Sequence, residues 1–274
     1  MKTILIPTDF SDAAHNAARY GADFACSVHA QKIVLYNAYS IPLANEMTWA
    51  LIEATDLKKA SEAGLERAKM LLKPFCDKRL EIETISDFGF LGQRLNEVAT
   101  EVHADMIIMG ITGGGTVAQA VFGSNALTAV HNTKLPLLIV PAMAQWQAVE
   151  QIAWACDYKN IKQTTPLQVI DDVLQLTNAQ LHVVHNDKDY KDFDPEIIQE
   201  NMHLHEFFNE RTFKIALLEG KDLSESVNQY VFNHGIDWLI VIPHQHNWLA
   251  SIFTKSHIKQ LAFHTHVPML CLQQ

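Results

Sequence analysis

Short apolar runs alternate with stretches of helical period along the first half of the chain. The apolar runs predict strands at residues 2–8, 32–39, 80–85, 105–109 and 137–140. Apolar positions three or four residues apart predict helices at residues 13–26, 55–74 and 91–102. Strands that alternate with helices favour right-handed βαβ crossovers, so we expect a parallel sheet with helices on both faces. The predicted fold class is therefore α/β, with a doubly wound, Rossmann-like arrangement.

The second half of the chain repeats this plan. The matching segments are 151–157 with 3–9, 180–186 with the second predicted strand, 237–242 with 105–110, and 267–272 with 135–140. The offset between the copies is 148 residues at the first strand and 132 at the fourth, so the second copy is 16 residues shorter between them. We expect two tandem domains, at 1–141 and 147–274, joined by a linker too short to hold them far apart.

A glycine-rich segment joins the fourth predicted strand to the next helical pattern. It places Gly110, Gly113, Gly123 and Ser124 between the strand and residues 126–130. Glycine lets a ligand approach the backbone closely, and the N–H groups at a helix start are unpaired and carry partial positive charge. The segment therefore predicts a cradle for phosphate groups. A flexible strand-to-helix turn is the alternative, because three consecutive glycines also permit one.

This spacing resembles the nucleotide-binding signature of the universal stress protein family, in its ATP-binding branch. Residues 4–11, which contain Pro-Thr-Asp-Phe-Ser, resemble the first strand of that family, and residues 135–141 resemble its last strand. The resemblance implies two Rossmann-like domains of the adenine nucleotide alpha hydrolase type. It also implies that the first domain binds ATP, with or without magnesium. It is strong over 1–141 and weaker over 147–274.

The resemblance further implies which residues would contact the adenine nucleotide. They follow the predicted strands and the glycine-rich segment: Pro7, Thr8, Asp9, Asn37, Met109, Gly110, Thr112, Gly113, Gly123, Ser124, Asn125 and Ala126. Asp9 would accept hydrogen bonds from the ribose or the adenine. The match at Asn37 is loose, because relatives tend to have an aliphatic residue there. Asp9 has a second interpretation as a helix N-cap or turn former, although Ser11 and Asp12 could provide the cap.

The second copy lacks most of this signature. The gap-free alignment replaces the three glycines by Ile242, Gln245 and Lys255, and it keeps only the serine, as Ser256. Side chains then occupy the positions where phosphates need bare backbone, so we expect that the second domain does not bind ATP in the family's way. The alternative is a charge contact from Lys255 to a phosphate.

The predicted phosphate cradle offers little for catalysis. No lysine or arginine lies between Met109 and Lys134, and the Gly-x4-Gly-Lys-Ser/Thr pattern does not occur in the sequence. Phosphoryl transfer needs cations on the transferring phosphate, so nucleotide binding, with at most slow hydrolysis, is the better hypothesis. We assign no catalytic residue. The first hypothesis is a cytosolic ATP-binding stress-response protein, and the alternatives are a nucleotide-independent interaction module and a slow ATPase.

Composition narrows the range of partners. The net charge is −10 and neither half has a basic stripe, so we do not expect nucleic acid to bind. No apolar run reaches the ~18 residues of a membrane span, and Pro7 and Asp9 come too early for a signal peptide, so we expect a cytoplasmic protein. The four cysteines lie far apart, which is typical of buried small residues rather than a disulfide or zinc set. We interpret the many histidines after residue 146 as solvated and assign no metal site.

The resemblance implies one further arrangement, an intramolecular pseudo-dimer. The homodimers of the family imply that the two sheets pack through their last strands, residues 137–140 and 269–272. The physical reason is that an apolar edge strand left open invites aggregation. The sequence leaves open whether the whole chain forms a homodimer and which protein partner it contacts.

Overall fold

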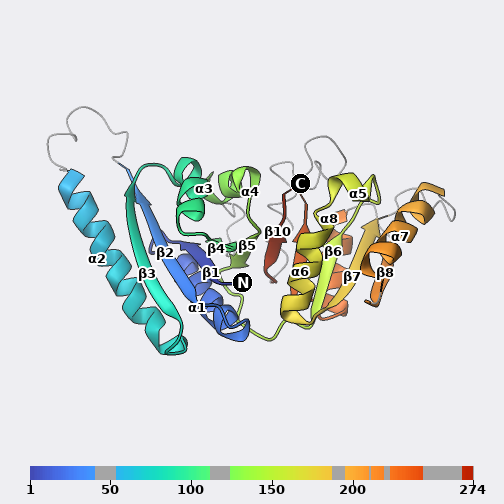
Figure 1. Cartoon of the computed structure of the whole chain (residues 1–274), viewed down its shortest axis with the longest axis horizontal. Helices are drawn as coiled ribbons and strands as arrows, with labels where there is room; N and C mark the ends of the chain where they lie inside the picture. Colours follow the sequence, from blue (N-terminus) through green and yellow to red (C-terminus); the bar gives the residue numbers. More distant parts are fainter. Residues whose placement is uncertain are drawn as a thin grey trace. The chain divides into compact units, whose positions relative to one another are not determined.

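The computed structural model describes residues 1–40, 54–111, 124–186, 195–209, 211–218, 223–242 and 267–273. These residues form two compact units, one that ends at Trp146 and one that begins at Gln147 (Figure 1). Each unit contains a sheet of five strands whose pairings are all parallel within the unit. The predicted α/β, doubly wound class is thereby confirmed.

The first unit has the strand order β3–β2–β1–β4–β5. Its elements are β1 (Thr3–Pro7), α1 (Asp12–Ser27), β2 (Lys32–Tyr39), α2 (Ala54–Leu72), the 3₁₀ turn η1 (Lys73–Phe75), β3 (Glu81–Phe88), α3 (Leu91–Glu101), β4 (Met106–Ile111), α4 (Ser124–Asn132) and β5 (Leu137–Pro141). The chain runs outward from β1 to β3 and then crosses back to β4 and β5. Right-handed crossovers in these two directions place α1 and α2 on one face and α3 and α4 on the other. The reversal leaves a switch point between β1 and β4, where open α/β sheets bind ligands.

The strands of the first unit are buried along their length. Ile4, Leu5 and Ile6 in β1 are fully buried, and so are Ile107 and Ile108 in β4. Helices cover both faces of a parallel sheet, which is why these strands appear in the sequence as continuous apolar runs rather than as an alternation of apolar and polar residues.

The second unit has the equivalent strand order, β8–β7–β6–β9–β10. Its elements are β6 (Gln151–Ala155), α5 (Ile161–Thr164), α6 (Leu167–Thr177), β7 (Gln180–Asn186), α7 (Pro195–Phe208), β8 (Phe213–Leu218), α8 (Leu223–Asn233), β9 (Trp238–Val241) and β10 (Met269–Cys271). The continuous α1 of the first unit has two helices, α5 and α6, in its place. Pro166 lies between them, and Thr165 before it is extended, as the proline ring requires.

The registers of the first two strands agree with the sequence repeat. β1 pairs with β2 through Thr3 and Lys32, and β6 pairs with β7 through Gln151 and Gln180. Both partners are shifted by the same 148 residues that align the two halves of the sequence. The two units therefore share one register at this position, and not only one strand order.

An aspartate directly before the fourth strand makes the same contact in both units. The Oδ2 of Asp105 accepts a hydrogen bond from the backbone N–H of Thr3 at 2.9 Å. The Oδ2 of Asp237 accepts one from the backbone N–H of Gln151 at 2.9 Å. Each bond fixes the start of the first strand against the start of the fourth, so the aspartate is a structural feature of the repeat.

The residues missing from the second copy belong between its second and third strands. Ile33 of β2 pairs with Ile82, whereas the equivalent Leu181 of β7 pairs with Phe213. The third strands are thus offset by 131 residues rather than 148. The sequence alone located the missing residues only to somewhere between the first and fourth strands. The strand registers locate them between the second and third strands.

Three predicted boundaries are wrong by a few residues. The strand predicted to end at residue 85 continues to Phe88, because it stays paired with β2. The strand predicted to end at residue 109 continues to Ile111, because its last residues stay paired with β5. The helix predicted to reach residue 74 ends at Leu72, and Pro74, which has no N–H to donate, lies in η1.

The prediction that all four cysteines are buried is wrong for two of them. Cys156 and Cys271 are buried, whereas Cys26 and Cys76 are half-buried, and none of the four forms a disulfide. Cys26 lies in the last turn of α1 and Cys76 directly follows η1, so both are near the end of a helix rather than in the sheet.

The part of the chain that the structure describes contains no helix long and apolar enough to cross a membrane. Within the same residues, no three histidine, cysteine, aspartate or glutamate side chains are grouped as metal ligands would be. All of the closely spaced histidines near the C-terminus, from His244 to His266, lie outside the described residues.

His182 in β7 is buried, in contrast to the solvated histidines that the sequence predicted. Its Nε2–H donates to Oε1 of Gln151 at 2.7 Å, and its Nδ1 accepts from the Tyr230 hydroxyl at 2.9 Å. These bonds use both ring nitrogens of the neutral imidazole. Burial and, to a smaller extent, the nearby charges of Lys214 and His234 lower the pKa of His182 from 6.5 to about 4.

The free energy of unfolding should therefore fall as the pH drops from about 6.5 to about 4. In this window His182 stays neutral in the folded protein and takes up a proton on unfolding, which favours the unfolded state. The loss should be about 3 kcal/mol, and His182→Gln should remove most of it. Urea denaturation over this pH range measures both proteins. Parallel pH profiles would show that another group is responsible.

Candidate functional site

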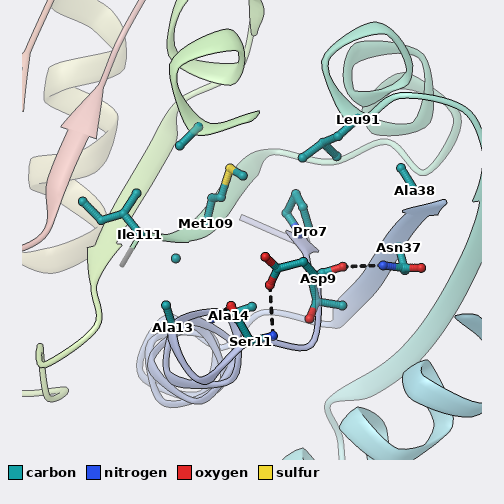
Figure 2. A pocket seen from close by; sticks show the side chains of 13 residues that line it. Pro7, Asp9, Ser11, Ala13, Ala14, Asn37, Ala38, Leu91, Met109 and Ile111 are labelled. Atoms are coloured by element: carbon teal, nitrogen blue, oxygen red, sulfur yellow. Dashed lines mark hydrogen bonds between the residues drawn. The ribbon is translucent and has the colours of Figure 1, made fainter. Parts of the chain in front are cut away.

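A cavity of about 180 Å³ lies at the carboxyl ends of β1 and β4 in the first unit (Figure 2). Its walls come from the β1–α1 connection, the start of α1, the ends of β2 and β4, and the first turns of α3 and α4. The lining residues are Pro7, Thr8, Asp9, Ser11, Ala13, Ala14, Asn37, Ala38, Leu91, Met109, Gly110, Ile111 and Ala126. The cavity therefore lies at the switch point of the strand order.

The structure brings seven of the predicted site residues together at this cavity: Pro7, Thr8, Asp9, Asn37, Met109, Gly110 and Ala126. Thr112, Gly113 and Gly123 lie outside the described residues. Ser124 and Asn125 begin α4, and only their backbone is described.

Six lining residues were missed by the sequence analysis: Ser11, Ala13, Ala14, Ala38, Leu91 and Ile111. Ser11 and the two alanines could have been found, because a helix cap that follows a strand end at a switch point belongs to the site by its position. Leu91 had no such signal, since it reaches the cavity only through the packing of α3.

The β1–α1 connection is shaped by its own side chains. The Oδ1 of Asp9 accepts a hydrogen bond from the backbone N–H of Ser11 at 3.0 Å, and the Thr8 hydroxyl oxygen accepts one from Phe10 at 3.0 Å. Ser11 caps α1, since its hydroxyl oxygen accepts from the N–H of Ala14 at 3.3 Å. Asp9 is thus a turn former and Ser11 is the cap.

Asp9 keeps one carboxylate oxygen for another partner. Its Oδ1 is used in the turn, while Oδ2 accepts no hydrogen bond from the described residues (Figure 2). Asp9 is exposed, and it is the one charged residue among the described residues that line the cavity. A carboxylate oxygen accepts and does not donate, so this position suits the hydroxyl or amino groups of a ligand.

Asn37 anchors the cavity to the interior of the unit. Its Nδ2 donates to the carbonyl oxygen of Thr8 at 2.7 Å (Figure 2). Its Oδ1 accepts from the Ser61 hydroxyl at 2.7 Å. The Ser86 hydroxyl donates in turn to Ser61 at 2.7 Å. This chain of bonds explains why a polar residue is tolerated where an aliphatic one was expected: every link satisfies a buried polar group.

Gly110 allows β4 and α1 to meet. A Cβ at this position would lie 2.3 Å from the carbonyl oxygen of Ala13 and 3.1 Å from the backbone nitrogen of Ala14. Real Cβ atoms are not found at 2.3 Å from a backbone oxygen, so any other residue would force α1 away from the strand. Gly110 thus has a packing role beside the phosphate role that the sequence predicted for it.

The second unit preserves the hydrogen bonds at the equivalent position. The Nδ1–H of His185 donates to the carbonyl oxygen of Cys156 at 2.9 Å, as Asn37 does to Thr8. The Oδ1 of Asp157 accepts from the backbone N–H of Lys159 at 3.1 Å, as Asp9 does from the second residue after it.

The contact between the fourth strand and the first helix differs in the second unit. Ile242 stands where the first unit has Gly110, and it is only 1% exposed. The helix that would meet it is interrupted before Pro166. The second unit thus repeats the connection after its first strand without the glycine that lets α1 approach β4.

A model of the universal stress protein family matches residues 1–141, which is about half of the chain. The chain belongs to the universal stress protein family. It is 30% identical over 142 residues to a universal stress protein of Methanocaldococcus jannaschii, a match that covers 51% of this chain and 81% of that protein. It is 24% identical over 294 residues to a universal stress protein of Synechocystis, with 98% of this chain and 99% of that protein covered.

The fold of the whole chain is also found in a solved structure. The crystal structure of a universal stress protein from Archaeoglobus fulgidus superimposes with a TM-score of 0.76 and covers 99% of this chain and 98% of its own. The sequence identity is only 14%, so this likeness shows a shared fold and nothing more.

Gly110→Ala should destabilise the first unit because the new methyl group would clash with the backbone of α1. We expect the free energy of unfolding to fall by about 3 kcal/mol. Gly235→Ala is the matched control: this glycine has a positive φ of 59° and no atom within 4 Å of an added Cβ, so it should lose only about 1 kcal/mol. Equal losses in urea denaturation would contradict the packing role of Gly110.

Proposed function

We propose that the first unit binds an adenine nucleotide, ATP, in the cavity between β1 and β4, and that the chain acts in the stress response through interactions that depend on the bound nucleotide. The observation that carries the proposal is the carboxylate of Asp9, which lines the cavity with Oδ2 still able to accept hydrogen bonds. Ribose hydroxyls are donors of the kind that such an oxygen binds.

The lining of the cavity suits the different parts of a nucleotide. Pro7, Met109 and Leu91 provide apolar surface for a base and sugar. Ala126 brings the first turn of α4 to the same cavity. The N–H groups at the start of a helix carry partial positive charge, which favours phosphate. The glycine spacing from Gly110 to Ser124 would continue this cradle.

Binding without rapid turnover is the function that this lining favours. The described lining residues include no lysine, arginine or histidine that could stabilise charge on a transferring phosphate. A slow ATPase and a nucleotide-independent interaction module are the competing functions. The interaction module would leave the cavity empty. Measuring the nucleotide bound per chain therefore distinguishes it from the proposed function.

The second unit is proposed not to bind ATP in this way. A buried isoleucine, Ile242, replaces Gly110, and the interrupted helix changes the wall that Ala13 and Ala14 form in the first unit. One nucleotide site per chain is therefore expected.

Protein purified from its expression host should release close to one adenine nucleotide per chain when it is denatured. Chromatography of the released nucleotide, with the protein concentration measured independently, gives the stoichiometry. Two nucleotides per chain would mean that the second unit also binds. No nucleotide, followed by no binding in titration with ATP and magnesium, would favour the nucleotide-independent module.

Asp9→Asn should weaken ATP binding by about ten-fold to a hundred-fold, which corresponds to the loss of a hydrogen bond to a charged group. Asparagine can still accept from the N–H of Ser11, so the turn should survive. Asp157→Asn is the matched control, because Asp157 makes the equivalent turn in the second unit. Isothermal titration measures the affinities. A smaller loss for Asp9→Asn than for Asp157→Asn would contradict the assignment of the site to the first unit.

A further inference from the structure

Two half-buried cysteines lie next to each other in the first unit, one in the last turn of α1 and one directly after η1. The Sγ of Cys26 is 3.7 Å from the carbonyl oxygen of Phe75 and 3.4 Å from the backbone nitrogen of Asp77. Cys76 is the residue between those two backbone atoms. The sulfur of Cys26 therefore lies against the backbone that carries the second cysteine.

Packing between α1 and η1 keeps this geometry in place. The guanidinium of Arg19 lies over the ring of Phe75, 4.5 Å from its centroid, so α1 holds the turn that precedes Cys76. Asp77 donates its backbone N–H to the sulfur of Cys26. Contacts with α1 therefore lie on both sides of Cys76, at Phe75 and at Asp77.

The two thiols differ in their surroundings. The Sγ–H of Cys76 donates to the carbonyl oxygen of Leu72 at 3.5 Å. Burial and, to a smaller extent, the nearby Cys26 and Asp23 raise the pKa of the Cys76 thiol to about 11. Cys76 therefore keeps its proton at neutral pH, which suits it to a second step in which that proton leaves with the displaced group.

We propose that Cys26 and Cys76 form a reversible intramolecular disulfide when the protein meets hydrogen peroxide. The Cys26 thiolate attacks one peroxide oxygen: the S–O bond forms, the O–O bond breaks, and the leaving hydroxide takes up a proton to become water. The Cys76 sulfur then attacks the sulfenic acid: the S–S bond forms, the S–O bond breaks, and the proton of Cys76 leaves with the hydroxide as water. Two thiols and one peroxide give one disulfide and two waters.

This redox site is separate from the proposed nucleotide site. Ala13 and Ala14 line the cavity at the start of α1, and Cys26 lies in its last turn. A helix of this length separates its two ends by about 20 Å. Disulfide formation therefore does not depend on nucleotide binding, and either property can be absent without the other.

The full-length chain treated with hydrogen peroxide should lose two of its four free thiols. Alkylation in denaturant followed by intact mass spectrometry counts the remaining thiols. The mass of the unalkylated protein should fall by two hydrogen atoms and return after dithiothreitol, and peptide mapping should link Cys26 to Cys76. No loss of thiols, or a link between two chains rather than within one, would overturn the proposal.

Single substitutions show whether these two cysteines react together. In Cys76→Ser the sulfenic acid of Cys26 has no partner, so it should be trapped by dimedone and the loss of two hydrogen atoms should disappear. Cys26→Ser should abolish the mass loss as well. Cys271→Ala is the matched control, because Cys271 is fully buried in the second unit, and it should still form the disulfide. Retention of the mass loss in either serine variant would contradict the pairing.

Discussion

The close approach of β4 to the first turn of α1 is the constraint on which the cavity of the first unit depends. Gly110 lies where a Cβ would be 2.3 Å from the carbonyl oxygen of Ala13, so strand and helix share the space that any side chain would need. This approach makes Ala13 and Ala14 part of the cavity lining. Asp9, in the connection that joins β1 to α1, lines the same cavity. The missing Cβ of Gly110 therefore shapes the wall that α1 provides.

In the second unit a side chain, Ile242, occupies the position of Gly110, and two helices replace the continuous first helix. Its first and second strands keep the register of the first unit, so the sheet does not account for the difference. A side chain at Ile242 cannot coexist with a helix that begins as close to the strand as α1 does. The extended Thr165 and the following Pro166 interrupt the helix after its first turn. The second unit thus lacks both the glycine at this position and the continuous first helix.

The sequence predicted the fold well because parallel strands covered on both faces appear as apolar runs, and because the two copies align without gaps over their last two strands. The site could be predicted where its residues adjoin a strand end, as at Pro7 and Asp9. The Asn37–Ser61–Ser86 chain could not, because its hydrogen bonds join three elements that are separate in the sequence. The exposure of Cys26 could not be predicted either, since it depends on how η1 packs against α1.

One hydrogen bond joins the end of the second strand to the connection that follows the first strand in both units. It shows which residue at the cavity has a structural role rather than a ligand-binding one. Asn37 donates to the carbonyl oxygen of Thr8 in the first unit, and His185 donates to that of Cys156 in the second. Because the second unit keeps this bond without the glycine signature, the bond belongs to the fold, and its role is to hold the connection after the first strand. Both polar atoms of the Asn37 amide are already bonded within the protein. A ligand in the cavity would therefore be recognised by Asp9 and by backbone groups, which favours contacts to a sugar over readout of a base by the Asn37 side chain.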